Sequence, residues 1–277
     1  MLKQRVITAV VLLALLLPAL FAGSRWPFAA LTLLMIGAAG WEWGRLNGAG
    51  GGAIGMGFGL ALLCLGALMA LGGEPVPASV WLVAALIWVL GGTWAVRGGP
   101  AQWPSLSKVA RCVLGIVALG TAWLAIIAAK ATGINFLLSV LCLVWAADIA
   151  AYFGGRAFGR RKLAPAISPG KSWEGVWSGM LGVLVLAAFW IALDRSFAVD
   201  SQSLYSRLLD RLGPVGLVVS MLFLASMSVV GDLVESLVKR SAGAKDSSAL
   251  LPGHGGVLDR IDALLPVFPL ALALCSM

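Results

Sequence analysis

Residues 213–262 read GPVGLVVSMLFLASMSVVGDLVESLVKRSAGAKDSSALLPGHGGVLDRID. The first half of this stretch is an apolar run that is long enough to cross a bilayer as a helix. The second half, Ser236 to Asp262, holds four Lys or Arg, three Asp and the chain's only His within 27 residues. This change from apolar to polar sequence predicts a membrane-spanning helix that runs into a polar segment at the membrane surface.

The rest of the chain has the composition of a membrane protein. Its mean hydropathy is +0.97 and only 12% of its residues are charged, which excludes an ordinary soluble domain. The pattern predicts an all-α polytopic integral membrane protein with about nine transmembrane helices. The apolar runs lie near 6–23, 26–40, 54–72, 79–96, 109–129, 134–153, 175–193, 213–235 and 261–276. Pro266 and Pro269 predict that the last run is kinked or only partly inserted.

The distribution of positive charge predicts the orientation. With nine spans and a cytoplasmic N-terminus, the inside loops and tail hold 15 of the 20 Lys and Arg residues, and the outside loops hold the other 5. Inside loops carry the excess of positive charge in multi-pass proteins, so we expect a multi-pass protein of the cell inner (plasma) membrane. Because these basic residues lie in short loops between spans, a nucleic-acid partner is not expected. The run after Met1–Arg5 lacks a clean cleavage site, which favours an uncleaved first span over a signal peptide.

The chain divides by polarity into two regions. Residues 1–130 are apolar helices with short loops and no obvious chemistry, whereas residues 131–277 carry three polar blocks that the topology places near the cytoplasmic face. Residues 194–212, on the other side, are predicted to form a solvated connector. The four cysteines are scattered without a C-x-x-C pair, and we interpret them as packing residues.

Asp148 is the first candidate functional residue. It lies near the end of a predicted span, where a carboxylate is costly and therefore indicates a functional site. The alternative is a structural pair with a nearby cation such as Arg156. Tyr152 follows Asp148 by four residues and shares its helix face.

Ser168–Gly175, with the sequence SPGKSWEG, is a candidate phosphate site. It is not a Walker A loop, because Pro165 stands where that motif needs glycine and no flanking strand is predicted. Ser172 is predicted to be the N-cap of the next helix. Backbone N–H groups, Lys171 and the hydroxyls of Ser168 and Ser172 at a helix start favour an anion site over an ordinary loop.

The remaining carboxylates come in pairs. Asp232 and Glu235 are three residues apart on one helix face, and Asp259 and Asp262 repeat that spacing. Several carboxylates near one membrane face favour a divalent cation, and Mg²⁺ takes one or two carboxylates together with substrate phosphates. One His without a nearby Cys does not make a zinc site. Lys239, four residues after Glu235, leaves an ordinary salt bridge as the alternative.

Pro252 to Gly256 reads PGHGG and predicts a tight turn before the last apolar run. Glycines allow a backbone to approach a ligand closely. His254 remains open to three interpretations: a general acid or base, a donor to phosphate, or a structural side chain.

The whole 27-residue stretch resembles the signature of the phosphatidate cytidylyltransferase (CDP-diacylglycerol synthase) family. That pattern runs Ser, two residues, Lys-Arg, four residues, Lys-Asp, then Pro-Gly-His-Gly-Gly, two residues, Asp-Arg, one residue, Asp. The matching positions are Ser236, Lys239, Arg240, Lys245, Asp246, Pro252 to Gly256, Asp259, Arg260 and Asp262. Asp148, the SPGKSWEG loop and Gly231-Asp232 also resemble family features, so the resemblance covers about residues 140–262.

The resemblance implies the reaction CTP + phosphatidate → CDP-diacylglycerol + pyrophosphate, an Mg²⁺-dependent step of phospholipid biosynthesis. It implies CTP, phosphatidate and membrane lipid as partners, a plausible homodimer, and K⁺ as a candidate second cation. Asp232 and Asp259 are assigned to the metal pair, with Asp246 and Asp148 as additional candidates. The expected phosphate and substrate contacts are Lys171, Lys239, Arg240, Lys245, Arg260, Ser236, His254, Ser168, Ser172, Tyr152, Gly255 and Gly256. The helices of residues 1–130 are expected to supply the lipid pocket.

Three rivals stay open. A CTP-dependent polyprenol kinase would release CDP in place of pyrophosphate. A CDP-alcohol phosphotransferase lacks support, because no D-G-x-x-A-R run is found. A transporter would place Asp148, Asp232 and Glu235 deep within inverted repeats, whereas here the polar residues gather at one face.

Overall fold

The computed structural model describes residues 2–276 and is almost entirely helical. The side chains of Lys3 and Arg5, which the topology prediction counts as inside charges, lie outside the described part, as does Met1. The helices are α1 (Leu2–Phe21), α2 (Trp26–Leu46), α3 (Gly52–Leu71), α4 (Ala78–Leu86), η1 (Ile87–Gly92), α5 (Thr93–Gln102), η2 (Trp103–Ser105), α6 (Lys108–Thr132), α7 (Ile134–Phe158), α8 (Trp173–Ser196), α9 (Leu204–Ser241), α10 (Leu258–Ile261) and α11 (Leu264–Ser276). The strands are β1 (Lys162–Ala164) and β2 (Ser168–Ser172).

Six of the described segments are long and apolar enough to cross a membrane, as expected of a multi-pass membrane protein. They are α3, the continuous Ala78–Ser105 segment, α6, α7, α8 and α9. The other three predicted spans coincide with α1, whose apolar described part is Val6–Phe21, and with α2 and α11, which are not among the six described segments.

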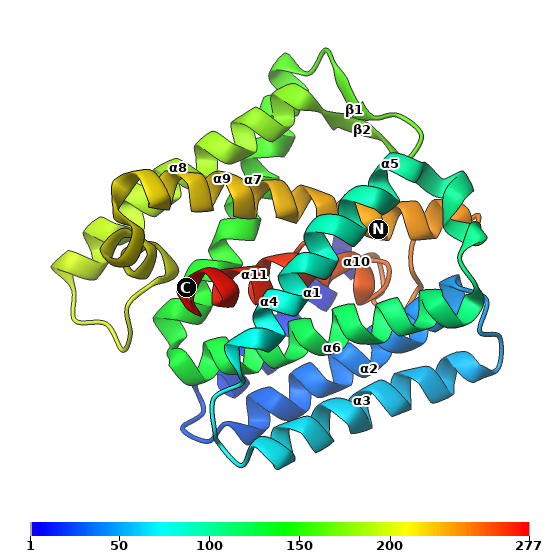
Figure 1. Cartoon of the computed structure of the whole chain (residues 1–277), viewed down its shortest axis with the longest axis horizontal. Coiled ribbons are helices and arrows are strands. Elements are labelled where there is room, and N and C mark those ends of the chain that lie inside the picture. The colour runs from blue at the N-terminus through cyan, green and yellow to red at the C-terminus, as the bar shows by residue number, and fades with distance from the viewer. Residues whose placement is uncertain (1, 277) are drawn as a thin grey trace.

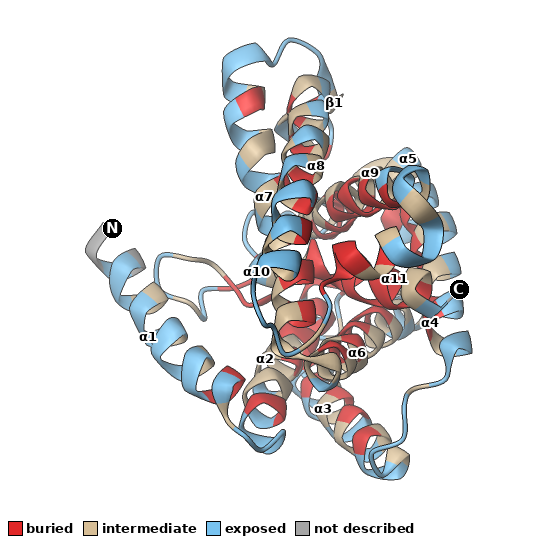
Figure 2. Ribbon diagram, turned by 90° about the vertical axis from the view of Figure 1, so that its left-hand side faces the viewer, coloured by how far each residue is buried: buried red, intermediate tan, exposed pale blue. Residues whose placement is uncertain are grey.

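The helices surround a short central helix. In Figure 1, α2, α3 and α6 lie together on one side, α7 and α8 form a long hairpin on the other, and α9 crosses between them. The 13-residue α11 fills the middle and contacts α4, α6, α7 and α9. Figure 2 shows α11 buried at the centre, while α1 projects outward with an exposed surface. The run predicted at 261–276 forms the short helix α11, which has Pro269 inside it, and its partial insertion stays a prediction.

The predicted all-α fold needs one correction. β1 and β2 form an antiparallel hairpin between α7 and α8, with Lys162 opposite Ser172 and Ala164 opposite Ser168. The SPGKSWEG loop is therefore partly a strand, which leads directly into α8. Ser172 caps α8, as predicted, because its side chain accepts a hydrogen bond from the Gly175 N–H.

The predicted solvated connector at 194–212 is only partly correct, because residues 195–200 are exposed but the chain is helical and buried again from Leu204. α8 continues to Ser196, α9 already begins at Leu204, and the side chains of Leu204, Tyr205 and Leu208 are fully buried. The chain is helical here because a hydrogen-bonded cap starts α9: the Ser203 hydroxyl accepts from the Ser206 N–H. Gly213 has a non-helical φ of 69°, so α9 consists of two helices that meet at a kink there, and the predicted start of a span at residue 213 coincides with this kink.

Close contact between α7 and α8 predicts a large effect of a small substitution. A Cβ atom on Gly179 of α8 would lie 2.8 Å from the backbone oxygen of Ala147 in α7. We expect Gly179→Val to force the hairpin apart and to lower stability in detergent by about 1–3 kcal/mol. Thermal unfolding measures this effect. Gly66→Val is the matched control, because a Cβ atom on Gly66 in α3 meets nothing within 4 Å; an equal loss in both variants would contradict the prediction.

Candidate active site

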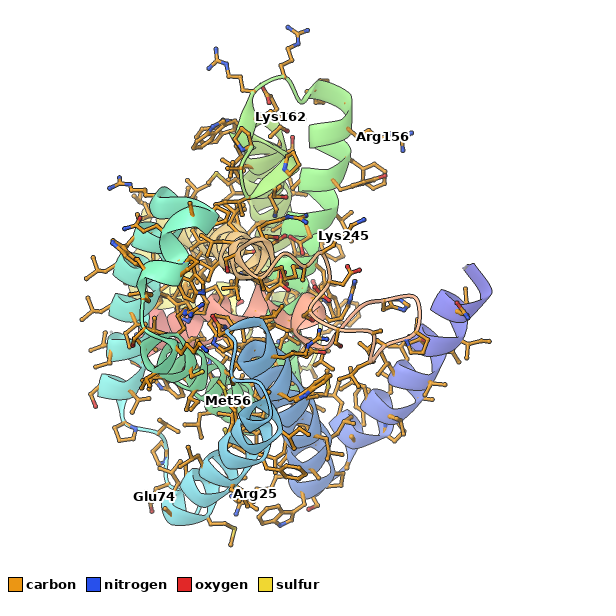
Figure 3. The ribbon with its side chains drawn as sticks, turned by 90° about the vertical axis from the view of Figure 1, so that its right-hand side faces the viewer. Arg25, Met56, Glu74, Arg156, Lys162 and Lys245 are labelled. Atoms are coloured by element: carbon orange, nitrogen blue, oxygen red, sulfur yellow. The ribbon has the colours of Figure 1, made fainter. Side chains whose placement is uncertain are left out.

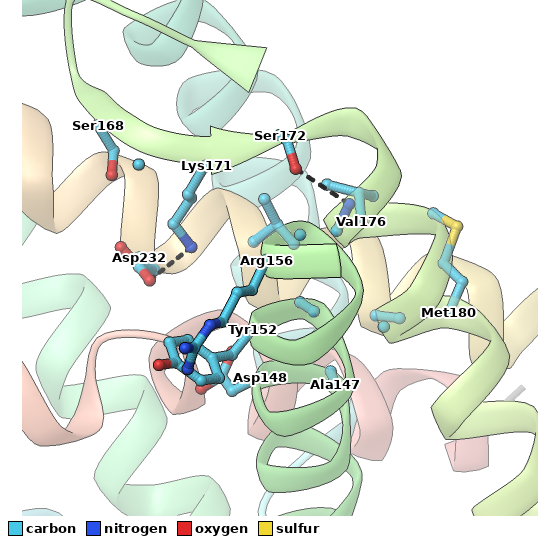
Figure 4. A pocket seen from close by; sticks show the side chains of 17 residues that line it. Ala147, Asp148, Tyr152, Arg156, Ser168, Lys171, Ser172, Val176, Met180 and Asp232 are labelled. Carbon is cyan, nitrogen blue, oxygen red and sulfur yellow. Dashed lines mark hydrogen bonds and ion pairs between the residues drawn. The ribbon is translucent and has the colours of Figure 1, made fainter. Parts of the chain in front are cut away.

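A cavity of about 610 Å³ opens between α7, β2, α8 and α9. Figure 4 shows side chains of α7 on one side of the cavity and those of β2 on another, facing the end of α9. The crossing of α7 and α8 at glycines brings these elements together, since larger residues there would clash. Its polar lining residues are Asp148, Tyr152, Arg156, Ser168, Lys171, Ser172 and Asp232.

An ion pair closes one wall of this cavity. Lys171 Nζ lies 2.6 Å from Asp232 Oδ2, and their side chains are 26% and 28% exposed, so both remain accessible from the cavity. Asp148, on α7, interacts electrostatically with both. The structure thus joins three candidate residues that come from two of the polar blocks: Asp148 and Lys171 from the first, and Asp232 from the second. Among the described residues, Asp148 forms no ion pair with Arg156, the structural alternative considered above.

Asp262 adds a further carboxylate, which the sequence analysis named as the partner of Asp259 and as part of the signature. It interacts electrostatically with Asp232, Asp148 and Lys171. The backbone oxygen of Asp262 packs against Gly231, at which a Cβ atom would come within 2.5 Å. The Gly231-Asp232 pair therefore lets the chain around Asp262 approach α9 and places its carboxylate beside the cavity.

A second charged cluster lies further along α9. Lys239 Nζ lies 2.6 Å from both Glu235 Oε2 and Asp259 Oδ1, which confirms the predicted pair with Glu235 and adds a partner. Asp259 Oδ2 also accepts from the backbone N–H groups of Ser247, at 2.9 Å, and Gly256, at 2.7 Å. Burial alone would raise the pKa of Asp259, but the bonds from Lys239 and these N–H groups lower it to about 2. Asp259 is therefore ionised across the physiological pH range.

The PGHGG segment forms the predicted tight turn. The Leu251 N–H donates to the Gly255 oxygen and the His254 N–H donates to the Leu251 oxygen, both at 2.8 Å. Gly255 has a φ of 82°, and a Cβ atom there would lie 2.6 Å from Asp259 Oδ2. Because Gly255 has no side chain, its backbone can lie close to the carboxylate of Asp259. His254 Nδ1 is buried without a hydrogen-bond partner in the structure.

The other predicted residues lie around these two clusters. The Ser236 hydroxyl donates to Asp232 Oδ1 at 3.2 Å, and Arg260 donates to the backbone oxygen of His254. Arg240, Lys245 and Asp246 are exposed. Figure 3 shows Arg156 and Lys162 near the top of the view, Lys245 below them, and Arg25 and Glu74 at the bottom. The predicted excess of basic residues on one side of the membrane stays a prediction.

One buried carboxylate was missed altogether. Glu42, in α2, is fully buried and accepts hydrogen bonds from the segment between Ser247 and Leu258. Its signal in the sequence is the one that singled out Asp148: an acidic residue at the end of an apolar run. It was passed over because the predicted span stopped at residue 40.

The donor set at the cavity determines which metal it suits. Among the residues that the structure describes, no three His, Cys, Asp or Glu side chains form a group that could hold a metal ion. Asp148 and Asp232 nevertheless supply hard oxygen atoms at the cavity wall. This arrangement fits Mg²⁺, which completes its coordination with waters and substrate phosphates.

Comparison with known proteins identifies the family. A family model described as the cytidylyltransferase family matches residues 3–277. The chain belongs to this family. It is 41% identical to a phosphatidate cytidylyltransferase of Pseudomonas aeruginosa over 99% of this chain and 97% of that protein. It is 35% identical to one of Brucella melitensis over 95% and 89% of the two chains, and 50% identical to one of Haemophilus influenzae over 50% and 44%. The family resemblance seen in residues 140–262 thus extends over nearly the whole chain.

Proposed function

We propose that this chain is a phosphatidate cytidylyltransferase, which converts CTP and phosphatidate to CDP-diacylglycerol and pyrophosphate. The observation that carries the proposal is the cavity beside Lys171 and Asp232, together with full-length similarity to curated phosphatidate cytidylyltransferases. The cavity lies among α7, α8 and α9, three of the long apolar helices. A lipid phosphate and a nucleotide can therefore meet there at the end of a membrane-embedded bundle.

The chemistry is a displacement at the α-phosphorus of CTP. An oxygen of the phosphatidate phosphate forms a bond to that phosphorus, and the bond to the bridging oxygen of the β-phosphate breaks as pyrophosphate leaves. The nucleophile is already anionic, so no strong general base is required. The obstacle is repulsion between two polyanions, and fixed positive charge lowers it. Lys171 and Arg156 line the cavity and supply such charge.

Among the four predicted metal ligands, the cavity favours Asp148 and Asp232 as the residues that would hold Mg²⁺. When bound, Mg²⁺ neutralises charge on the phosphates and aligns the reacting groups. Asp259 is engaged by Lys239, and Asp246 is exposed, so we propose that these two act outside the first metal site. A second cation, K⁺, remains part of the proposal.

The remaining residues divide by their distance from the cavity. Ser168, Ser172 and Tyr152 line it and are proposed to contact substrate. The exposed Arg240, Lys245 and Arg260 are proposed to attract and hold the triphosphate, and His254 to bond a phosphate oxygen. Ser236 would orient Asp232, to which its hydroxyl donates.

We also propose nine spans in a cell inner (plasma) membrane, with the N-terminus and the site at the cytoplasmic face. Two contacts support a shared face. Thr8, near the start of α1, donates to the Pro252 oxygen, and Arg45, near the end of α2, donates to the Ser247 oxygen. We further propose that residues 1–130 form the scaffold and lipid pocket, that residues 131–277 form the catalytic region, and that two copies form a homodimer.

The decisive experiment follows both products. Purified protein in detergent is incubated with phosphatidate, cytidine-labelled CTP and Mg²⁺, and we expect label in the lipid phase with equimolar pyrophosphate in the water phase. Chelation of Mg²⁺ should stop both. Release of CDP with a polyprenol acceptor, and no label in phosphatidate-derived lipid, would instead establish the kinase. A folded sample that transfers nothing to either acceptor would overturn both the cytidylyltransferase and the kinase assignments.

A further inference from the structure

Glu42 lies in the N-terminal half of the chain but contacts the segment that leads into Asp259. Its side chain is fully buried at the end of α2. Oε1 accepts from the Ser248 hydroxyl and, at 3.0 Å, from the Val257 N–H. Oε2 accepts from the Ser247 hydroxyl at 3.1 Å and from the Leu258 N–H at 2.7 Å.

Four donor groups surround the side chain, and the single Ser247 hydroxyl hydrogen is shared between Glu42 and Asp259. A carboxylate offers about four acceptor positions, and here each oxygen receives two donors. The backbone beside this contact leaves no room for a side chain. A Cβ atom on Gly256 would lie 2.3 Å from Glu42 Oε1 and 2.1 Å from the Ser247 hydroxyl oxygen. Arg45, one turn along α2, donates to the Ser247 backbone oxygen. The end of α2 therefore holds both ends of the segment from Ser247 to Leu258.

The same segment holds Asp259. The Ser247 hydroxyl oxygen lies 3.1 Å from Glu42 Oε2 and 2.9 Å from Asp259 Oδ2, so one hydroxyl stands between two carboxylates. The N–H groups of Ser247 and Gly256 donate to Asp259 Oδ2. Asp259 in turn binds Lys239 at 2.6 Å. A chain of direct contacts thus runs from α2 through the segment to the cationic end of α9.

We propose that Glu42 is a positioning residue for the nucleotidyl transfer, which fixes Asp259 and Lys239 through the Ser247–Leu258 segment. The inference rests on the proposed function and deepens it, because it gives the N-terminal half of the chain a defined part in the site. Glu42 has no place in the signature pattern. Its role follows only from the four hydrogen bonds that cross between the two halves.

Glu42→Gln tests this role without a change of size. The amide keeps one acceptor oxygen, and its NH₂ group faces two donors that it cannot satisfy. We expect kcat per folded molecule to fall roughly 10- to 100-fold, as for other residues that orient a site indirectly. The KM for CTP should rise as well, because His254 and Arg260, which are proposed to hold the triphosphate, lie in or just after the segment that Glu42 holds. Glu74→Gln, in an exposed loop at the other end of the molecule, is the control and should match the wild type.

A purely structural role gives a different result. It would lower the thermal midpoint and the folded fraction of Glu42→Gln while leaving kcat per folded molecule unchanged, and this outcome overturns the proposal. If Glu42→Gln does not fold, Ser248→Ala decides, because it removes one of the four donors. A reduced kcat in folded Ser248→Ala supports the proposal, and an unchanged kcat overturns it. If the wild-type protein transfers no cytidylyl group, the proposed function itself fails. If the wild type is active and only the role of Glu42 fails, the proposed function stands.

Discussion

Asp232→Asn is expected to lower kcat/KM for cytidylyl transfer by about 10²- to 10³-fold. Asp232 is the carboxylate that α9 contributes to the cavity, where it pairs with Lys171 and lies within electrostatic reach of Asp148 and Asp262. Asparagine has nearly the same shape but carries no charge. It would weaken the binding of any cation shared with the substrate phosphates and would leave Lys171 without its partner. Transfer of labelled cytidine into lipid measures the loss.

The matched control for Asp232→Asn is on the same helix. Asp210 lies at the far end of α9, is exposed, and accepts a hydrogen bond from Gln202. Asp210→Asn should leave transfer unchanged. The thermal midpoint of Asp232→Asn should stay near that of the wild type, because a partly exposed ion pair contributes only about 0–1 kcal/mol to stability. Transfer by Asp232→Asn within threefold or so of the control would remove Asp232 from the site.

Asp259→Asn is expected to abolish turnover while the protein remains folded and inserted. The side chain of Asp259 organises Lys239, Ser247 and Gly256 at once, and an amide can accept at only one of its two terminal atoms. The NH₂ group would face either Lys239 or the two N–H groups. We expect a loss of at least about 10²-fold in kcat.

The fold should survive Asp259→Asn because Lys239 keeps Glu235 as a partner at 2.6 Å. Gel filtration in detergent and thermal unfolding check this, and Asp210→Asn again serves as the control. Near-normal turnover by a folded Asp259→Asn protein would show that the arrangement of the second cluster has no part in catalysis. Aggregation of the variant would show that Asp259 is needed first for the structure.

Much of the helical framework was predictable because long apolar runs leave little choice of structure. The runs at 109–129 and 134–153 became α6 and α7 with small extensions, since the flanking residues continue the backbone hydrogen bonds. The prediction failed where local signals conflicted. The predicted start of a span at residue 213 coincides with the kink at Gly213–Pro214, but the prediction missed the helix before it, in which Leu204 and Tyr205 are buried.

Individual residues of the candidate site were predictable from the sequence, but the contacts between distant residues were not. The spacing of Asp148 and Tyr152 predicted a shared face, and Ser172 was recognised as a cap, because both depend on residues close in sequence. The ion pair of Lys171 with Asp232 depends on how β2 meets α9, which no local pattern encodes. Glu42 illustrates the same limit, since its four donors lie some two hundred residues away along the chain.

The buried position of α11 has a consequence for biosynthesis. Every helix that packs against it, α4, α6, α7 and α9, precedes it in the chain and is therefore inserted earlier. Until α11 arrives, those helices enclose a gap that lipid or water must fill. The bundle therefore closes late in synthesis, when α11 is inserted. The charged segment just before α11 is completed at the same stage. Partly synthesised molecules thus already contain every residue that lines the cavity, but they lack the buried helix that packs against α7 and α9.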